Sequence, residues 1–304
     1  MENPGLLNWG RICLVAIIWG GAFMTVKIAL RDIDPLTLAA ARVVIGACAL
    51  YTLLKLRGGR LPALNNRVVW GFAIGIGVLS SALPFALLSW GQQYVPSAFA
   101  GMTMAALPIF VLPLAHAFVP GDRMSTRKSI GFAVGFAGTA VLVGTGGLGE
   151  VDGPLEIWAR FACVGAALCY AVGSIVTRRC PDVDQLSLST AALLTAGIIL
   201  TPIALIVEGL PGSISLSPLI ALIYLGLIPT AVAFIIKVAV IRSAGPSFMT
   251  LTNYQVPVWS VLFGFLFLNE ALPPQLFLAL VLILSGIAIS QWRTLVGLIL
   301  GDKT

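Results

Sequence analysis

The feature that most constrains this chain is a series of long apolar runs separated by short polar connections. Each run is about 20 residues long, the length that a helix needs to cross roughly 30 Å of hydrocarbon. Ten such runs occur, at 9–28, 35–55, 68–90, 96–118, 128–145, 157–177, 187–208, 217–241, 246–268 and 274–292. They predict an all-α integral membrane protein with ten transmembrane helices.

The composition favours a membrane protein over a soluble one. Of the 304 residues, 59% are hydrophobic and 10% are charged, whereas soluble domains are about 25% charged. The connections between the runs are too short to hold a soluble domain. We therefore expect a single transmembrane domain over residues 1–304.

Several kinds of chemistry have no basis in the sequence. The net charge is +6, but the basic residues are dispersed between apolar runs, so the pattern does not predict nucleic-acid binding. The five cysteines lack metal-ligand spacing, and His116 is the only histidine, so we expect no metal, no cofactor and no disulfide framework. The chain has no H-E-x-x-H, G-x-S-x-G or P-loop motif, so we expect neither an enzyme nor an ATP-driven pump.

Basic residues collect in every second connection, which predicts the orientation in the membrane. These connections carry Lys55, Arg57, Arg60 and Arg67; Arg123, Arg127 and Lys128; Arg178 and Arg179; Arg242; and, after the last run, Arg293 and Lys303. The connection between the fifth and sixth runs is instead acidic, with Glu150, Asp152 and Glu156. By the positive-inside rule, both termini are cytoplasmic, and we expect the inner (plasma) membrane of a bacterial-type cell.

The chain matches itself weakly at two pairs of segments. PSAFAGMTMAALPIF (96–110) resembles PSFMTLTNYQVPVW (246–259), and each segment is followed by an acidic residue, Asp122 or Glu270. IIWGGAF in the first run has a counterpart in LCYAVGS of the sixth run. The chain therefore divides into two repeats of five spans each.

The two predicted repeats cover residues 9–145 and 157–292. Five is an odd number of spans, so the second repeat enters the membrane in the opposite orientation to the first. Inverted repeats with a binding site near the bilayer midplane, at their interface, are typical of secondary transporters. We therefore expect alternating access through a central cavity.

Polar and aromatic side chains gather at the midpoints of six runs. An unpaired polar group in hydrocarbon is costly, so such groups should face protein or a water-filled cavity. The predicted substrate-binding residues are Trp19, Phe23, Ser80, Ser81, Thr103, Tyr170, Thr230, Asn253, Tyr254 and Gln255. Trp19 and Phe23 share a helix face and with Tyr170 would form an aromatic wall. The alternative is structural, with hydroxyls bonded to the preceding turn and amides that tie helices together.

Four prolines at or near these midpoints are hinge candidates: Pro84, Pro108, Pro229 and Pro257. A proline inside a helix removes a backbone donor and frees a carbonyl one turn earlier. For Pro257 that carbonyl belongs to Asn253. The alternative is that the prolines form static kinks.

Arg42 and Lys237 are basic residues near the ends of their apolar runs. Snorkelling to the interface is the default for such side chains. Arg42 could pair with Asp32 or Asp34 at the outer rim, which would make its role structural. Lys237 is a candidate charge contact for a substrate carboxylate, approached from the cytoplasmic side.

Glycines in the fifth run predict close helix packing. Gly131, Gly135 and Gly138 recur at i, i+4 and i+7. Small residues at this spacing let a neighbouring helix approach closely.

Three stretches of the chain resemble a known family: WGGAF (19–23), DPLTLAAAR (34–42) and AGPSFMTLTNYQVPVWSVLFGFLFLNEALPPQLFLALVLILSGIAI (244–289). The order and spacing of these three stretches make the chain similar to the ten-helix, EamA-type members of the drug/metabolite transporter superfamily. Among these it resembles bacterial amino-acid exporters of the YddG kind. The second repeat departs from the first in carrying Ala192 opposite Arg42.

The resemblance implies two inverted five-helix repeats around a central cavity. Helices one, three, four, six, eight and nine would line this cavity, and these are the runs with polar midpoints. The resemblance also implies a small-molecule substrate and a lipid environment. Bacterial members mostly export amino acids and related metabolites, so we expect an exporter or facilitator of amino acids, including aromatic and apolar ones.

The energy source and some alternatives stay open. No aspartate or glutamate lies in the central part of any run, which favours facilitated diffusion or exchange over proton coupling. Phosphorylated sugars or nucleotide-sugars are the alternative substrates, but they would need several basic residues deep in the cavity. A membrane scaffold or sensor without transport is the alternative of another class. The sequence is compatible with a monomer or a homodimer.

Overall fold

A computed structural model describes residues 5–118, 124–144, 153–244, 246–249, 251–271, 274–290 and 292. Within these ranges every regular element is a helix. The chain belongs to the all-α class, as the apolar runs predict.

The first half of the chain forms five successive helical segments. Two of them change helix type along their length, through the π-helical segment η1 and the 3₁₀ segment η2. The elements are α1 (Gly5–Ala29), α2 (Pro35–Leu56), α3 (Arg67–Gly77), η1 (Val78–Ala82), α4 (Leu83–Gly91), α5 (Ser97–Thr103), η2 (Met104–Ala106), α6 (Leu107–Phe118) and α7 (Thr126–Gly144).

The second half contains a second π-helical segment, η3, at a place that corresponds to η1. Both lie in the third helical segment of their half. The elements are α8 (Glu156–Arg179), α9 (Gln185–Val207), α10 (Leu216–Leu225), η3 (Gly226–Val232), α11 (Ala233–Ala244), α12 (Pro246–Met249), α13 (Thr252–Leu268) and α14 (Pro274–Ser290).

Seven helical segments of the described chain are long and apolar enough to cross a membrane, and α14 is a shorter apolar helix. The seven are Gly5–Ala29, Pro35–Leu56, Arg67–Gly91, Ser97–Phe118, Glu156–Arg179, Gln185–Val207 and Leu216–Ile241. The predicted fifth and ninth spans correspond to α7, which begins with the basic residues Arg127 and Lys128, and to α13, which has 17 residues. The prediction of a multi-pass helical membrane protein is confirmed, and the count of ten spans stays a prediction.

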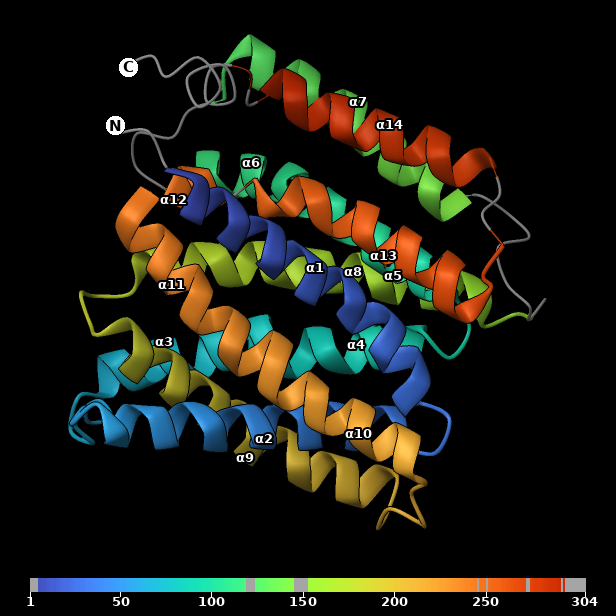
Figure 1. The fold of residues 1–304 in the computed structure, drawn as a ribbon. Coiled ribbons are helices and arrows are strands. Elements are labelled where there is room, and N and C mark those ends of the chain that lie inside the picture. The colour runs from blue at the N-terminus through green and yellow to red at the C-terminus, as the bar shows by residue number, and fades with distance from the viewer. Residues whose placement is uncertain are drawn as a thin grey trace.

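The helices lie side by side in one bundle (Figure 1). α1 packs in the middle against α13, α10 and α11, while α7 pairs with α14 along one edge and α2 with α9 along the other. α14 finishes at the end of the bundle where α1 begins, which we call the terminal end. We call the end where α1 finishes the opposite end.

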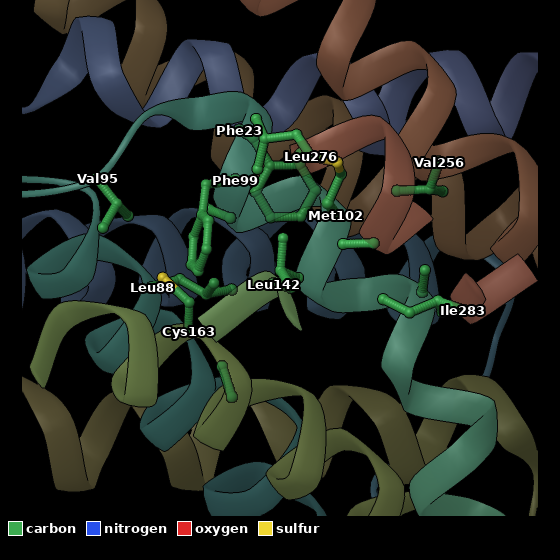
Figure 2. Packing of buried hydrophobic residues seen from close by; sticks show 14 of the residues in the cluster. Phe23, Leu88, Val95, Phe99, Met102, Leu142, Cys163, Val256, Leu276 and Ile283 are labelled. Carbon is green, nitrogen blue, oxygen red and sulfur yellow. The ribbon is translucent and has the colours of Figure 1, made fainter. Parts of the chain in front are cut away.

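The largest apolar cluster joins the two halves of the chain. Figure 2 shows Phe23, Phe99 and Met102 from the first half packed with Cys163 and Ile283 from the second. Phe99 and Ile283 are fully buried. The packing between the halves is therefore part of one continuous core.

The predicted close packing of the fifth run is confirmed. Gly131, Gly135 and Gly138 are all buried: an added Cβ at Gly131 or Gly138 would meet α14, and one at Gly135 would meet Ile109 of α6. The approach is tightest at Gly286, where an added Cβ would lie 2.5 Å from Gly135 N and 2.6 Å from Gly131 O. The backbones of α7 and α14 touch because neither carries a side chain there.

Replacing Gly286 with alanine should separate these two backbones. We expect Gly286→Ala to lower the free energy of unfolding by about 1–3 kcal/mol, because the atoms nearest to the added Cβ belong to the backbone and cannot move aside as a flexible side chain would. Thermal unfolding in detergent would measure the loss. The matched control is Gly71→Ala in α3, where an added Cβ meets nothing within 4 Å and helix propensity favours alanine. Equal stability of the two variants would contradict the packing.

Two glutamates at the opposite end cap helices in the other half of the chain. Glu208, after α9, accepts hydrogen bonds from Leu36 N (2.8 Å) and Thr37 N (2.7 Å) at the start of α2. Glu270, after α13, accepts from Ser97 N (2.7 Å) and Ala98 N (2.9 Å) at the start of α5. The first amides of a helix lack intrahelical partners and lie at the positive end of the helix dipole. A carboxylate there accepts their hydrogen bonds and also interacts favourably with the dipole.

Local backbone geometry brings Glu270 to its site. Asn269 has a left-handed conformation (φ 52°) that ends α13, a position where asparagine is tolerated. Glu270 N then bonds back to Gly264 O (3.1 Å). Gly264 has no side chain, which leaves room for the carboxylate of Glu270. Asp122, the sequence counterpart of Glu270, lies outside the described residues.

Removal of this carboxylate should leave two helix-start amides without partners. We expect Glu270→Ala to lower the free energy of unfolding by about 2 kcal/mol, measured by thermal unfolding in detergent. Asp182→Ala is the control, because Asp182 is an exposed carboxylate between α8 and α9. A loss no larger than that of the control would show that the cap does not stabilise the fold.

Candidate functional site

The structure brings several of the predicted aromatic residues together. Phe23 of α1 is a member of the large apolar cluster, and Trp19, Tyr170 and Tyr254 pack against it. Tyr170 also packs against the cluster between α2 and α9. The residues of the predicted aromatic wall thus share one neighbourhood, to which α13 adds Tyr254.

Trp19 ties α1 to the second π-helical segment. Its indole Nε1 donates a hydrogen bond to the carbonyl of Pro229 (3.1 Å). In the same segment Thr230 Oγ1 donates to Leu225 O (2.8 Å), five residues earlier. Side chains thus supply donors that this irregular backbone needs, and the hinge candidate Pro229 is held by Trp19.

Ser80 and Ser81 lie in the first π-helical segment. Ser80 faces Gly173 of α8, whose missing side chain leaves space for the hydroxyl. Neither serine hydroxyl makes a hydrogen bond within the described part of the chain. Interruptions of this helix type occur frequently at functional sites, and the sequence carried no signal for them beyond the prolines nearby.

Thr103 is placed differently from these serines. Its side chain is fully buried, and its hydroxyl donates to Ala100 O (2.6 Å) in the preceding turn. This is the local bond that the structural alternative predicts. Its contact with a substrate stays a prediction.

Asn253, Tyr254 and Gln255 lie in the first turn of α13. Asn253 and Gln255 are partly buried. The hydroxyl of Tyr254 is buried and has no hydrogen-bond partner in the described residues. Three polar side chains at a helix start inside an apolar run provide groups that a ligand could satisfy.

All four hinge candidates lie within continuous helical segments. Pro84 and Pro108 lie just after η1 and η2, inside the segments Arg67–Gly91 and Ser97–Phe118. Pro229 and Pro257 lie inside η3 and α13. At each place the missing donor interrupts the hydrogen-bond ladder. Whether any of them bends during function stays a prediction.

The expected pairing of Arg42 at the rim is wrong. Asp32 instead accepts hydrogen bonds from the backbone and hydroxyl of Ser215, and these bonds lower the pKa of Asp32. The guanidinium of Arg42 lies 3.9 Å from the ring centre of Phe85, and its Nε donates to Thr230 Oγ1 (3.3 Å). Arg42 lies about 10 Å along α2 from the start of that helix. This distance from the rim is the signal in the sequence that favours an inward position of its side chain.

Lys237 lies on α11 and is partly buried. It has no ion pair or hydrogen bond with the rest of the described chain. Its position toward the terminal end agrees with a charge contact approached from that side, which stays a prediction.

A cavity of about 250 Å³ lies between α2 and α9, away from the predicted site residues. It is lined by Val44, Ala47, Cys48, Leu193, Leu194, Gly197, Ile198 and Thr201. None of the predicted site residues lines it, and its walls are almost wholly apolar. It is not the predicted binding site.

The sequence matches a family model in both halves. The model of the EamA-like transporter family covers residues 10–144 and again residues 157–292. The two matches leave out only the connection between α7 and α8 and the ends of the chain.

Curated relatives cover nearly the whole chain at low identity. The uncharacterized transporter YoaV of Bacillus subtilis (strain 168) is 24% identical, over 91% of this chain and 94% of its own length. A probable terminal-alkyne amino-acid exporter of Streptantibioticus cattleyicolor is 24% identical, over 93% of each chain. A probable amino-acid metabolite efflux pump of Escherichia coli (strain K12) is 25% identical, over 92% of this chain and 94% of its own.

The fold also has a counterpart among solved structures. One crystal structure superposes with a TM-score of 0.63 at 23% identity and covers 93% of this chain and 96% of its own. This likeness shows a shared fold.

The unpartnered hydroxyl of Tyr254 leads to a stability prediction. A buried polar group without a partner costs about 1–3 kcal/mol, so Tyr254→Phe should raise the free energy of unfolding in the absence of a ligand. Thermal unfolding of the purified protein in detergent would measure the change. Tyr51→Phe, at an exposed position of α2, is the control and should change nothing. A lower Tm for Tyr254→Phe would mean that the hydroxyl has a partner in the folded protein.

Proposed function

We propose that this chain, which belongs to the EamA-like transporter family, is a secondary transporter of amino acids or similar small metabolites. The observation that carries the proposal is the meeting of aromatic and hydroxyl side chains from both halves inside the bundle. Trp19, Tyr170 and Tyr254 come from three helices and border one cluster. Alternating access needs binding groups from both halves at one place, and this arrangement supplies them.

The names of two relatives support amino acids as the substrate class. One is a probable amino-acid exporter and the other a probable amino-acid metabolite efflux pump. The aromatic side chains of the candidate site suit apolar and aromatic substrates. Export or facilitated diffusion of amino acids is therefore the preferred activity.

The two halves act in this proposal as inverted repeats that rock about the site. The predicted repeats, 9–145 and 157–292, nearly coincide with the two family matches. Matching π-helical segments in the third helical segment of each half also support the repeat. Both termini face the cytoplasm in this proposal, so the opposite end faces the cell exterior.

The substrate in this proposal contacts residues from both halves. Trp19, Phe23 and Tyr170 hold an apolar or aromatic side chain. The polar part meets hydroxyls and amides of η1, η3 and α13, with Lys237 as a charge contact near the cytoplasmic end. The candidate hinges are Pro84, Pro108, Pro229 and Pro257.

The acidic residues favour transport without proton coupling. In the described chain, every aspartate and glutamate lies in a connection or in the first turn of a helix. Glu156, in the first turn of α8, is paired with Arg160. Proton-coupled carriers commonly use carboxylates inside the membrane, so exchange or facilitated diffusion is the expected mode.

Counterflow in proteoliposomes tests the proposed function. Vesicles loaded with unlabelled amino acids would receive labelled phenylalanine, tryptophan, methionine or threonine outside, with no ion gradient. Accumulation of a tracer is the expected result. Absence of accumulation, with protein shown to be folded, would contradict an amino-acid exchanger, and phosphorylated sugars would then be the next tracers.

A variant pair tests the aromatic wall in the same assay. Trp19→Leu should raise the KM for aromatic tracers by roughly three- to tenfold, because it removes an aromatic contact. Trp158→Leu is the control, because Trp158 is 63% exposed on α8. Equal KM values for the two variants would remove Trp19 from the binding site.

A further inference from the structure

The geometry points to Arg42 as the group that binds the carboxylate of the transported molecule. This inference rests on the proposed function and names the charged end of its substrate. Arg42 is absent from the residues predicted to bind substrate, because its place in the sequence suggested the membrane rim. The structure turns its guanidinium into the bundle.

Side chains from several helices enclose the guanidinium. Phe85 of α4 lies beneath it at 3.9 Å, and Thr230 of η3 accepts from its Nε. Tyr170 of α8 and Tyr224 of α10 lie close enough to interact with it electrostatically. A head group with neighbours on four elements cannot face lipid.

Packing between α2 and η3 fixes this direction. Gly46 is one turn from Arg42 and so shares its face of α2. An added Cβ at Gly46 would lie 2.6 Å from Thr230 Cγ2, and one at Gly226 would lie 2.5 Å from Ile45 Cγ2. The two glycines let the elements touch, and Arg42 lies beside that contact.

The charge of Arg42 is not compensated in the described chain. It has no ion pair there, and the acids near the start of α2 are engaged or exposed. Asp32 bonds to Ser215, Glu208 caps α2, and Asp34 is exposed. A buried cation without an acidic partner is strongly destabilising, and one ring contact with one hydrogen bond offsets only part of that cost.

The free donors of Arg42 match a carboxylate. A guanidinium has five N–H donors in a planar fork, and Thr230 takes the one on Nε. The four on the two Nη atoms have no hydrogen-bond partner among the described residues. Arg42 is only partly buried, and neither of its Nη atoms is one of the fully buried polar atoms that lack a hydrogen-bond partner. Both Nη atoms therefore remain accessible to a ligand. Two parallel N–H groups form the bidentate pairing that suits a carboxylate.

The residues around Arg42 suit a ligand with one negative charge, whose uncharged part lies among aromatic side chains. Phe85, Thr230, Tyr170 and Tyr224 are neutral neighbours, so one cation meets one anion. A phosphate dianion would need further basic groups. Tyr170 packs against the large cluster as well as lying near Arg42, so a ligand held at Arg42 would extend toward Trp19 and Tyr254. The matching place in the second half holds Ala192, which adds no second guanidinium.

Ligand-induced thermal stabilisation of the purified full-length protein tests the inference. The probes are 3-phenylpropionate, which has a carboxylate and no amine, phenethylamine, which has the reverse, and phenyl phosphate. We expect 3-phenylpropionate to bind the wild type more tightly than either other probe. Arg42→Gln should weaken its binding by roughly ten- to a hundredfold and leave that of phenethylamine unchanged. Arg42→Lys, which keeps the charge but loses the fork, should fall between.

The control removes a similar charge from the same helix. Lys55 of α2 is exposed and lies 5.4 Å from the ring of Tyr51, and Lys55→Gln should bind every probe as the wild type does. Without ligand, Arg42→Gln should be at least as stable as the wild type, because it removes an uncompensated charge. A merely structural Arg42 would give the reverse, with a lower Tm and an unchanged preference for the carboxylate.

The outcomes separate this inference from the proposed function. Equal binding of 3-phenylpropionate by wild type and Arg42→Gln, or no binding by the wild type, overturns the carboxylate site. Tighter binding of phenyl phosphate overturns the ligand class. Arg42-dependent binding of 3-phenylpropionate, together with no amino-acid counterflow by the wild type, keeps the site and refutes amino-acid transport.

Discussion

The constraint on which this structure depends is that backbone N–H and C=O groups in hydrocarbon must find partners inside the protein. A regular helix meets it alone, so an irregular helix is tolerated only where other groups supply what is missing. In η3, the indole of Trp19 donates to the carbonyl of Pro229, and Thr230 donates to Leu225 O. The same side chains were singled out as candidate ligand contacts, so the helix break and the candidate site have one physical origin.

Charge is distributed by the same rule. Glu208 and Glu270 are at the opposite end of the bundle, where each stabilises the start of a helix in the other half of the chain. These bonds hold the halves together at their rim. In the described chain no acid lies in the central part of a helix, and the buried Glu156 at the start of α8 is paired with Arg160. Against that background Arg42 stands out, because it is turned inward and its carboxylate neighbours are used elsewhere. Acids at the rim and a cation inside are the arrangement that the proposed carboxylate site requires.

Much of the fold follows from the sequence, because spans depend on hydropathy and close contacts on glycine spacing. Gly131, Gly135 and Gly138 packed as their spacing indicated. The direction of Arg42 did not follow, because it depends on which face of α2 meets η3, and that is a property of partner helices. The π-helical segments could not be predicted from the sequence either, because an i→i+5 turn is made of the same apolar residues as an α-turn. Of the candidate site, the aromatic set could be predicted, whereas the place of Asn253 in the first turn of α13 depends on where that helix begins.

The two π-helical segments also determine which changes of chain length each half tolerates. Such a segment holds one residue more per turn than the α-helix around it, and one residue corresponds to a rotation of about 100°. Loss of a single residue within Gly226–Val232 would turn the π-helical turn into an α-turn, which completes the same rotation with one residue fewer, so α11 would keep roughly its present orientation. An added residue has no such outlet, and it would rotate α11 and carry Lys237 away from its present face. In this span of the chain, a one-residue deletion is therefore tolerated better than an insertion.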